Sequence, residues 1–260
     1  MADDTGSREL GSRYFQMTLQ SLVQYCSGNL TRRTLILVLI PLIFASYFGT
    51  LAFAISFAPG VFDWRSRAIS KLLYPENDPQ FHWIASIGVS IAGLLMIPFA
   101  GYISRRLRPC SSIASNAGAF VFGAGAVSLS LAALIVSHPS RGSSSFSSLH
   151  ETLARFSAIA FGAGMLFFYW CAVRARSIPA ADKESRFRIL VAWGLLTLPA
   201  ILVVAMRVLA HARLQWSNPV YRALENRALW QLGFWEWLGS AAVFLFLLSS
   251  ALLLPECACE

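Results

Sequence analysis

Charged residues are scarce in this chain of 260 residues. Only 13% of its residues are Asp, Glu, Lys or Arg, whereas 56% are apolar. Soluble domains usually carry about 25% charged residues. This shortage excludes a large soluble domain beside the apolar segments. We therefore interpret the chain as one membrane domain with short loops and tails.

Several catalytic and metal-binding motifs are also missing. The four histidines show neither a His-x-x-x-His nor a His-Glu-x-x-His spacing, the spacings typical of zinc hydrolases. No Gly-x-Ser-x-Gly run marks a nucleophilic serine. Residues 1–30 lack the compact apolar core of a cleavable signal peptide, so we expect none. No metal and no cofactor is predicted from these patterns.

Six apolar runs, each about 20–24 residues long, fill most of the chain. At a rise of about 1.5 Å per residue, each run can cross a hydrocarbon core about 30 Å thick. In lipid the backbone must satisfy its own hydrogen bonds, so such runs form helices. The runs are Thr34–Phe57, Trp83–Ser104, Ala117–Val136, Thr152–Val173, Ile189–Ala210 and Leu232–Leu254.

These runs predict an all-α, polytopic transmembrane six-helix bundle with short amphipathic interfacial helices. Residues 1–33 are expected to form a cytoplasmic tail with an interfacial helix, 34–254 the six-span domain, and 255–260 a cytoplasmic C-terminal tail. In the first loop, a short helix over Trp64–Leu73 followed by a turn is expected. The third loop, Ala212–Gln231, has a helix-start signal at Ser217-Asn218-Pro219 and predicts another interfacial helix.

Basic residues indicate the orientation of the bundle. With the N-terminus inside, twelve Lys and Arg residues fall in inner segments and seven in outer loops. Basic residues are enriched in cytoplasmic loops, so both termini are predicted to be cytoplasmic in a multi-pass protein of the cell membrane. The formal net charge of +8 then reflects topology and contact with anionic lipid, and no nucleic-acid partner is expected.

The cysteines give a second, independent indication of orientation. All five lie on the side that the basic residues place inside, and none lies in an outer loop. Thiols in the cytoplasm stay reduced, so no disulfide is predicted. The five are Cys26, Cys110, Cys171, Cys257 and Cys259.

Polar residues gather at the predicted outer ends of the spans, where all four histidines also lie. Charged groups within spans cost several kcal/mol unless they are paired or wetted, so they usually face the bundle interior. The pattern predicts one polar pocket that opens to the outer leaflet. The candidate ligand-binding residues are His150, Glu151, Arg155, Arg207, His211 and Glu236.

Three functions fit this pattern. In the leading hypothesis, Arg155 and Arg207 hold an anionic head group and Glu151 and Glu236 position them. The protein would then bind, or help to remodel or transport, a lipid or lipid-linked anionic molecule. The first alternative is a metal-dependent intramembrane hydrolase that uses the outer His and Glu residues. The second is a non-catalytic assembly partner, in which Glu151–Arg155 is a structural ion pair. Whether the protein is an enzyme is left open.

Small residues spaced by four predict close helix packing. The same faces could join copies of this chain, or this chain and a different one, into an oligomer. Pro98 and Pro199 lie inside the second and fifth spans and could kink them. The small pairs are Ser86/Ser90, Gly88/Ala92, Ala119/Gly123 and Ala160/Gly164.

The first outer loop and the fourth span resemble a known six-span family. The loop reads Arg67-Ala68-Ile69-Ser70, then Tyr74-Pro75-Glu76, then Phe81, and the fourth span begins His150-Glu151-x3-Arg155-Phe156. This pattern, with Glu236 opening the last span, is similar to the damage-regulated autophagy modulators and the GPI-lipid remodelling factor, and to bacterial six-span proteins of similar outline. Lys71 and Leu72 stand where that family usually has aspartate and glycine. The resemblance implies six helices and an outer-leaflet lipid connection.

Overall fold

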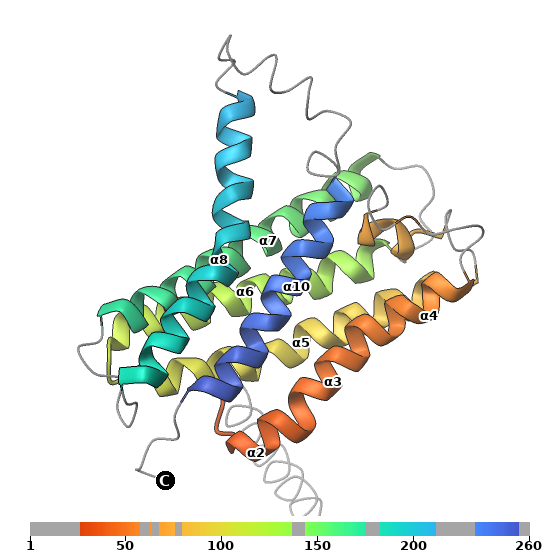
Figure 1. Ribbon diagram of the computed structural model, residues 1–260. Helices are drawn as coiled ribbons and strands as arrows, with labels where there is room; N and C mark the ends of the chain where they lie inside the picture. The colour runs from red at the N-terminus through yellow and green to blue at the C-terminus, as the bar shows by residue number, and fades with distance from the viewer. Residues whose placement is uncertain are drawn as a thin grey trace, which may run out of the picture.

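The structure, a computed structural model, describes residues 27–57, 63, 68–75, 80–136, 144–174, 183–211 and 232–254. For residues 144–147, 183–186, 200, 203–211 and 232 it describes the backbone alone. Within these ranges the chain forms helices and turns, without a strand (Figure 1). The predicted helices of the N-terminal tail and of the third loop lie outside the described residues, as does the C-terminal tail.

The first membrane helix is continuous from Arg32 to Phe57 but alternates between α-helical and wider π-helical turns. Pro41 has no N–H to donate to the preceding turn, and the π-helical segment η1 (Leu35–Leu39) ends two residues before it. The hydroxyl of Thr50, the first residue of α4, donates to the carbonyl of Ser46 in the π-helical segment η2 (Ala45–Gly49) at 2.6 Å and competes with backbone donors there. The segments are α2 (Arg32–Thr34), η1 (Leu35–Leu39), α3 (Ile40–Phe44), η2 (Ala45–Gly49) and α4 (Thr50–Phe57).

Further along the chain come a short 3-10 helix and five long helices. These are η3 (Ile69–Leu73), α5 (His82–Leu107), α6 (Ser112–Val136), α7 (Ser144–Arg174), α8 (Lys183–His211) and α10 (Leu232–Leu253). Five helices of the described part are long and apolar enough to cross a membrane, and α8 adds a shorter apolar stretch, Phe187–Pro199. The prediction of an all-α transmembrane bundle is confirmed, while the count of six spans stays a prediction.

Helix α8 changes direction along its length. Figure 1 shows its first half packed in the bundle and its second half leaving it. Pro199 lies inside the helix, where its ring removes a backbone hydrogen bond and clashes with the preceding turn. The C-terminal half, which carries Arg207 and His211, therefore starts from a bend.

The bundle has two ends, which differ in the elements that they carry. The η3 end carries η3 and the first turns of α5, α7 and α10. The α2 end carries α2, the connection of α5 to α6, and the last turns of α7 and α10.

At the α2 end, Arg32 donates through Nε to the carbonyl of Ala251 at 3.0 Å and through a second nitrogen to that of Leu252. These carbonyls close α10 and have no partner within it, so Arg32 caps the helix.

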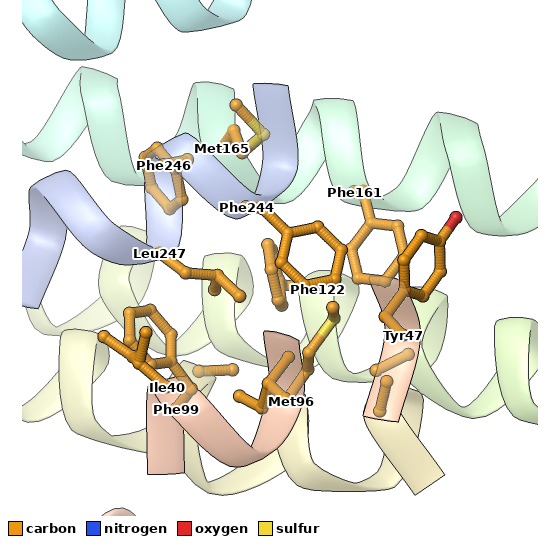
Figure 2. Close-up of a cluster of buried hydrophobic side chains, with 14 of the residues drawn as sticks. Ile40, Tyr47, Met96, Phe99, Phe122, Phe161, Met165, Phe244, Phe246 and Leu247 are labelled. Carbon is orange, nitrogen blue, oxygen red and sulfur yellow. The ribbon is translucent and has the colours of Figure 1, made fainter. Parts of the chain in front are cut away.

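An aromatic core joins the helices, and several of its side chains are shown in Figure 2. Phe122 of α6 lies fully buried with its ring centroid 4.8 Å from that of Phe161 of α7. The ring of Phe244 of α10 lies 4.8 Å from that of Tyr47 of the first helix. Aromatic pairs at this spacing contribute about 0.5–1.5 kcal/mol beyond the area they bury.

Small residues bring α6 and α7 close together. A Cβ atom added to Gly164 would lie 2.8 Å from the Cβ of Phe122, and one added to Gly125 would lie 3.1 Å from that of Ala160. A Cβ at Gly88 would overlap Thr50 of the first helix. Gly123, in contrast, faces open space, so the prediction that it mediates packing is wrong for the contacts within this chain. Oligomerisation through such faces stays a prediction.

Two serines connect α5 and α6. The hydroxyl of Ser90 donates to the carbonyl of Ser130 at 3.0 Å, and the hydroxyl of Ser130 donates to the carbonyl of Ser90 at 2.9 Å. Both side chains are buried. The small pairs of the second span thus help to pack helices within one chain, as the sequence spacing predicts.

Candidate functional site

The segment η3 closes one end of the bundle. Its apolar residues Ile69, Leu72 and Leu73 are all buried, and the segment packs against α4, α5, α6 and α10. The predicted short helix of the first loop is therefore a 3-10 helix over Ile69–Leu73 in the described part of that loop, and a turn follows it. The Ile69-Ser70 motif of the loop thus forms the first two residues of η3.

Glu236 of α10 holds the first turn of η3. Its carboxylate accepts the backbone N–H of Ser70 at 3.2 Å and the Ser70 hydroxyl at 3.5 Å, and it also accepts the backbone N–H of Ile69. The first N–H groups of a helical turn have no partner inside it, and an anionic acceptor is favourable there. Glu236 thus caps η3 from a helix 166 residues away in sequence.

A second polar contact joins α10 to the first helix near the same end. The hydroxyls of Tyr47 and Ser240 lie 2.7 Å apart, and the Tyr47 side chain is buried. Ser240 follows Glu236 by one helical turn, so the two residues lie on the same face of α10. One face of α10 therefore binds both η3 and the first helix.

His150 of α7 faces the interior. Only 5% of it is exposed, and its Nδ1 lies 3.0 Å from the carbonyl oxygen of Ala132 in α6. Because a carbonyl only accepts, Nδ1 carries the hydrogen in this contact. The imidazole also makes a T-shaped contact with the ring of Tyr74, just after η3, at a centroid distance of 5.7 Å. His150 thus joins α7 to α6 and to the first loop.

Glu151 and Arg155 form an ion pair on a different face of α7. A guanidinium nitrogen of Arg155 lies 2.8 Å from a carboxylate oxygen of Glu151, and the side chains are 73% and 57% exposed for Arg155 and Glu151, respectively. An exposed pair four residues apart on a helix contributes about 0.3–0.5 kcal/mol. The pair therefore stabilises the fold little and is accessible from outside the bundle.

From this pair toward the α2 end, α7 presents an exposed apolar stripe. Ile159 is 68% exposed, Leu166 38% and Trp170 50%, and they follow Arg155 at helical spacing along one side of α7. The stripe ends at the exposed Arg174, whose guanidinium lies 4.7 Å from the ring centre of Trp170. An exposed arginine thus bounds the stripe at each end.

The predicted site residues separate into distinct environments. Glu151 and Arg155 contact each other on the exposed face of α7, whereas His150 and Glu236 each bind a different backbone segment inside the η3 end. The side chains of Arg207 and His211 lie outside those that the structure describes, so their part in the predicted pocket stays a prediction.

The metal hydrolase alternative receives no support from this geometry. Among the residues that the structure describes, no three His, Cys, Asp or Glu side chains come together as a metal site would require. The described cysteines, Cys110 and Cys171, lie near the α2 end and do not form a disulfide.

Sequence reasoning missed Tyr47, Ser70 and Ser240 as polar contacts of this end. Ser70 belongs to the loop motif, and Tyr47 and Ser240 lie within apolar spans. The signal that could have identified this end is a hydroxyl residue in the first span and another in the last span, both at about the membrane depth of Glu236.

No family model, no curated protein and no solved structure matches this chain, so the family resemblance stays a prediction.

Proposed function

We propose that this protein, an integral membrane protein of the cell membrane, binds a lipid or a lipid-linked anionic molecule at the outer leaflet, and that Arg155 holds its anionic head group. In this proposal both termini are cytoplasmic and the η3 end faces outward. Binding would serve to position, remodel or transport the bound molecule.

The level of Arg155 along α7 is the observation that supports this proposal most. Arg155 and Arg174 are nineteen residues apart in sequence, which is a rise of about 29 Å in an α-helix. The hydrocarbon core of a bilayer is about 30 Å thick. If Arg174 lies at one membrane interface, Arg155 lies at the other, where lipid head groups are.

The chemistry of the Arg155 pair suits an exchangeable anionic ligand. A guanidinium presents its N–H donors in a planar fork that matches a phosphate or carboxylate. Its observed partner, Glu151, forms an exposed pair with it, and such a pair is worth at most about 1 kcal/mol. A head group can therefore replace Glu151 at little cost, while its chains lie along the apolar stripe of Ile159, Leu166 and Trp170.

The buried contacts of the η3 end would act as the frame of this site. His150, one residue before Glu151, fixes the rotation of α7 by its contact with Ala132. Glu236 and Tyr47 fix α10 against η3 and the first helix. These residues would position the exposed face of α7 without touching the ligand.

Lipid retention tests the proposal. Purified protein, equilibrated with phosphatidylglycerol and released from detergent in a native mass spectrometer, should keep one lipid fewer after Arg155→Ala. Lys71→Ala is the matched control, since Lys71 is exposed at the same end but lies off α7. Glu151→Gln should raise retention, because it removes the competing carboxylate.

The opposite signs of these two α7 variants distinguish binding from a structural ion pair. A structural pair would make Arg155→Ala and Glu151→Gln behave alike. Equal lipid retention in the wild type, Arg155→Ala and Glu151→Gln proteins would refute the proposed function.

A further inference from the structure

A groove runs between α8 and α10, which lie side by side (Figure 1). Its volume is about 380 Å³, within the range of about 300–1,000 Å³ that is typical of ligand pockets. Its walls include Ala192, Leu195 and Leu196 of α8 and Leu245, Leu248 and Ser249 of α10. The one hydroxyl among these six donates to a carbonyl of its own helix, that of Phe246, at 3.1 Å.

The groove opens toward the outside of the bundle. Leu195 is 63% exposed and Leu245 50% exposed, so an apolar molecule can enter from the bilayer. Next to the wall residues in sequence, Trp193 of α8 and Phe246 of α10 are fully buried, and their ring centroids lie 4.9 Å apart. These rings therefore help to pack α8 against α10 beside the groove.

Cationic groups lie at the α2 end of the groove. Arg188 is exposed and precedes Ala192 by four residues and Leu195 by seven, so it lies on the same face of α8 as those wall residues. On the other wall, the Arg32 guanidinium contacts the carbonyl of Leu252, itself a wall residue. Two carbonyls use two of the five N–H donors of Arg32.

We propose that this groove binds one acyl chain of an anionic phospholipid of the leaflet at the α2 end, and that Arg188 and Arg32 hold its phosphate. The apolar walls of the groove match the acyl chain of such a lipid, and the cationic end of the groove matches its phosphate. A sterol or a helix of another chain would fill the apolar length without using the cations. Under the predicted topology this is the cytoplasmic leaflet, which carries anionic lipids.

This site is separate from the one proposed at Arg155. It lies between other helices and at the other end of the bundle, so each site can fail without the other. Arg155→Ala should leave the groove occupied, and a groove variant should leave the retention effect of Glu151→Gln in place.

Photocrosslinking of the full chain in nanodiscs tests the groove. The probe is phosphatidylglycerol with a diazirine on one acyl chain, and phosphatidylcholine with the same chain is the comparison. Crosslinks should map to peptides that contain residues 192–196 and 245–252. The yield there should be about tenfold higher with phosphatidylglycerol, the effect of a charge-assisted hydrogen bond, and Arg188→Gln should remove most of that preference.

Filling the groove should abolish these crosslinks. Ser249→Phe places a ring in the groove, and Ala192→Phe fills it from the other wall if the first variant does not elute as folded protein. Val127→Phe adds the same ring to an exposed position of α6 and should change nothing. Equal yields with the two lipids, or crosslinks spread evenly over α6 and the groove, would mean a layer of non-specific lipid only and would overturn the proposal.

Discussion

Replacement of Glu236 by alanine should release η3 from the bundle. The variant loses the acceptor of the Ile69 and Ser70 N–H groups and of the Ser70 hydroxyl. Net hydrogen bonds to a charged group contribute about 1.5–3 kcal/mol, and a buried donor left without a partner costs about 1–3 kcal/mol. Allowing for overlap of these effects, we expect η3 to open more easily by about 2–3 kcal/mol.

Thiol accessibility measures this opening. In a cysteine-free background, Leu72→Cys places a thiol at a buried position of η3, where it reacts with maleimide only when η3 opens. A change of about 2–3 kcal/mol corresponds to an increase of about 30- to 150-fold in the open population. The labelling rate of this thiol should rise by about that factor in Glu236→Ala, provided that opening and closing are fast relative to labelling.

Two controls make the result specific. Glu151→Ala removes a carboxylate from the same end of the bundle, but from an exposed pair, and should leave the Leu72→Cys rate within about twofold. A thiol at the exposed position 71 should react equally fast in every background. If Glu236→Ala and Glu151→Ala changed the labelling rate of the Leu72→Cys thiol equally, the conclusion that Glu236 caps η3 would be wrong.

Two further predictions concern helix packing. Gly164→Leu should lower the midpoint of thermal unfolding in detergent by several degrees, because its side chain would meet the backbone of Phe122 within about 3 Å and overpacking costs about 1–3 kcal/mol. Gly123 faces open space, so Gly123→Leu should leave the midpoint unchanged. A similar loss in both variants would refute the packing assignment. Ser130→Ala should destabilise the protein by about 0.6 kcal/mol, because it removes the buried hydrogen bond from the Ser130 hydroxyl to the Ser90 carbonyl and leaves the Ser90 hydroxyl bonded to the backbone carbonyl of residue 130; urea unfolding should detect this, and an unchanged midpoint would contradict it.

The membrane helices could be predicted because their signal is local. An apolar run long enough to cross a bilayer fixes both the helical state and the approximate ends of a helix. The run Trp83–Ser104 became α5, His82–Leu107, with small differences at the ends. The π-helical turns around Pro41 were not predicted, because apolar length says nothing about how each turn closes.

The candidate site could be predicted only where its contacts are local. Glu151 and Arg155 are four residues apart, and helical spacing alone brings them together. The contacts of Glu236 with Ser70 and of Tyr47 with Ser240 join residues 166 and 193 positions apart. No periodicity in the sequence connects such residues. They are brought together only by the packing of α10 against η3 and the first helix.

Grouping residues by depth also concealed which way they face. Successive residues of an α-helix point about 100° apart. His150 and Glu151 have the same depth, yet one is buried against α6 and the other is exposed. Separating helical faces as well as depths would have assigned His150 to the interior of the η3 end and Arg155 to the surface.

Orientation in the membrane is the claim on which the outer-leaflet function of Arg155 depends. Lys71 of η3 and Arg108, after α5 at the α2 end, are both exposed, so single cysteines at these positions report the two ends of the bundle. In a cysteine-free background on intact cells, a membrane-impermeant maleimide should label Lys71→Cys at once and Arg108→Cys only after permeabilisation. Labelling of Arg108→Cys on intact cells, with Lys71→Cys silent, would invert the bundle and contradict the outer-leaflet function of Arg155.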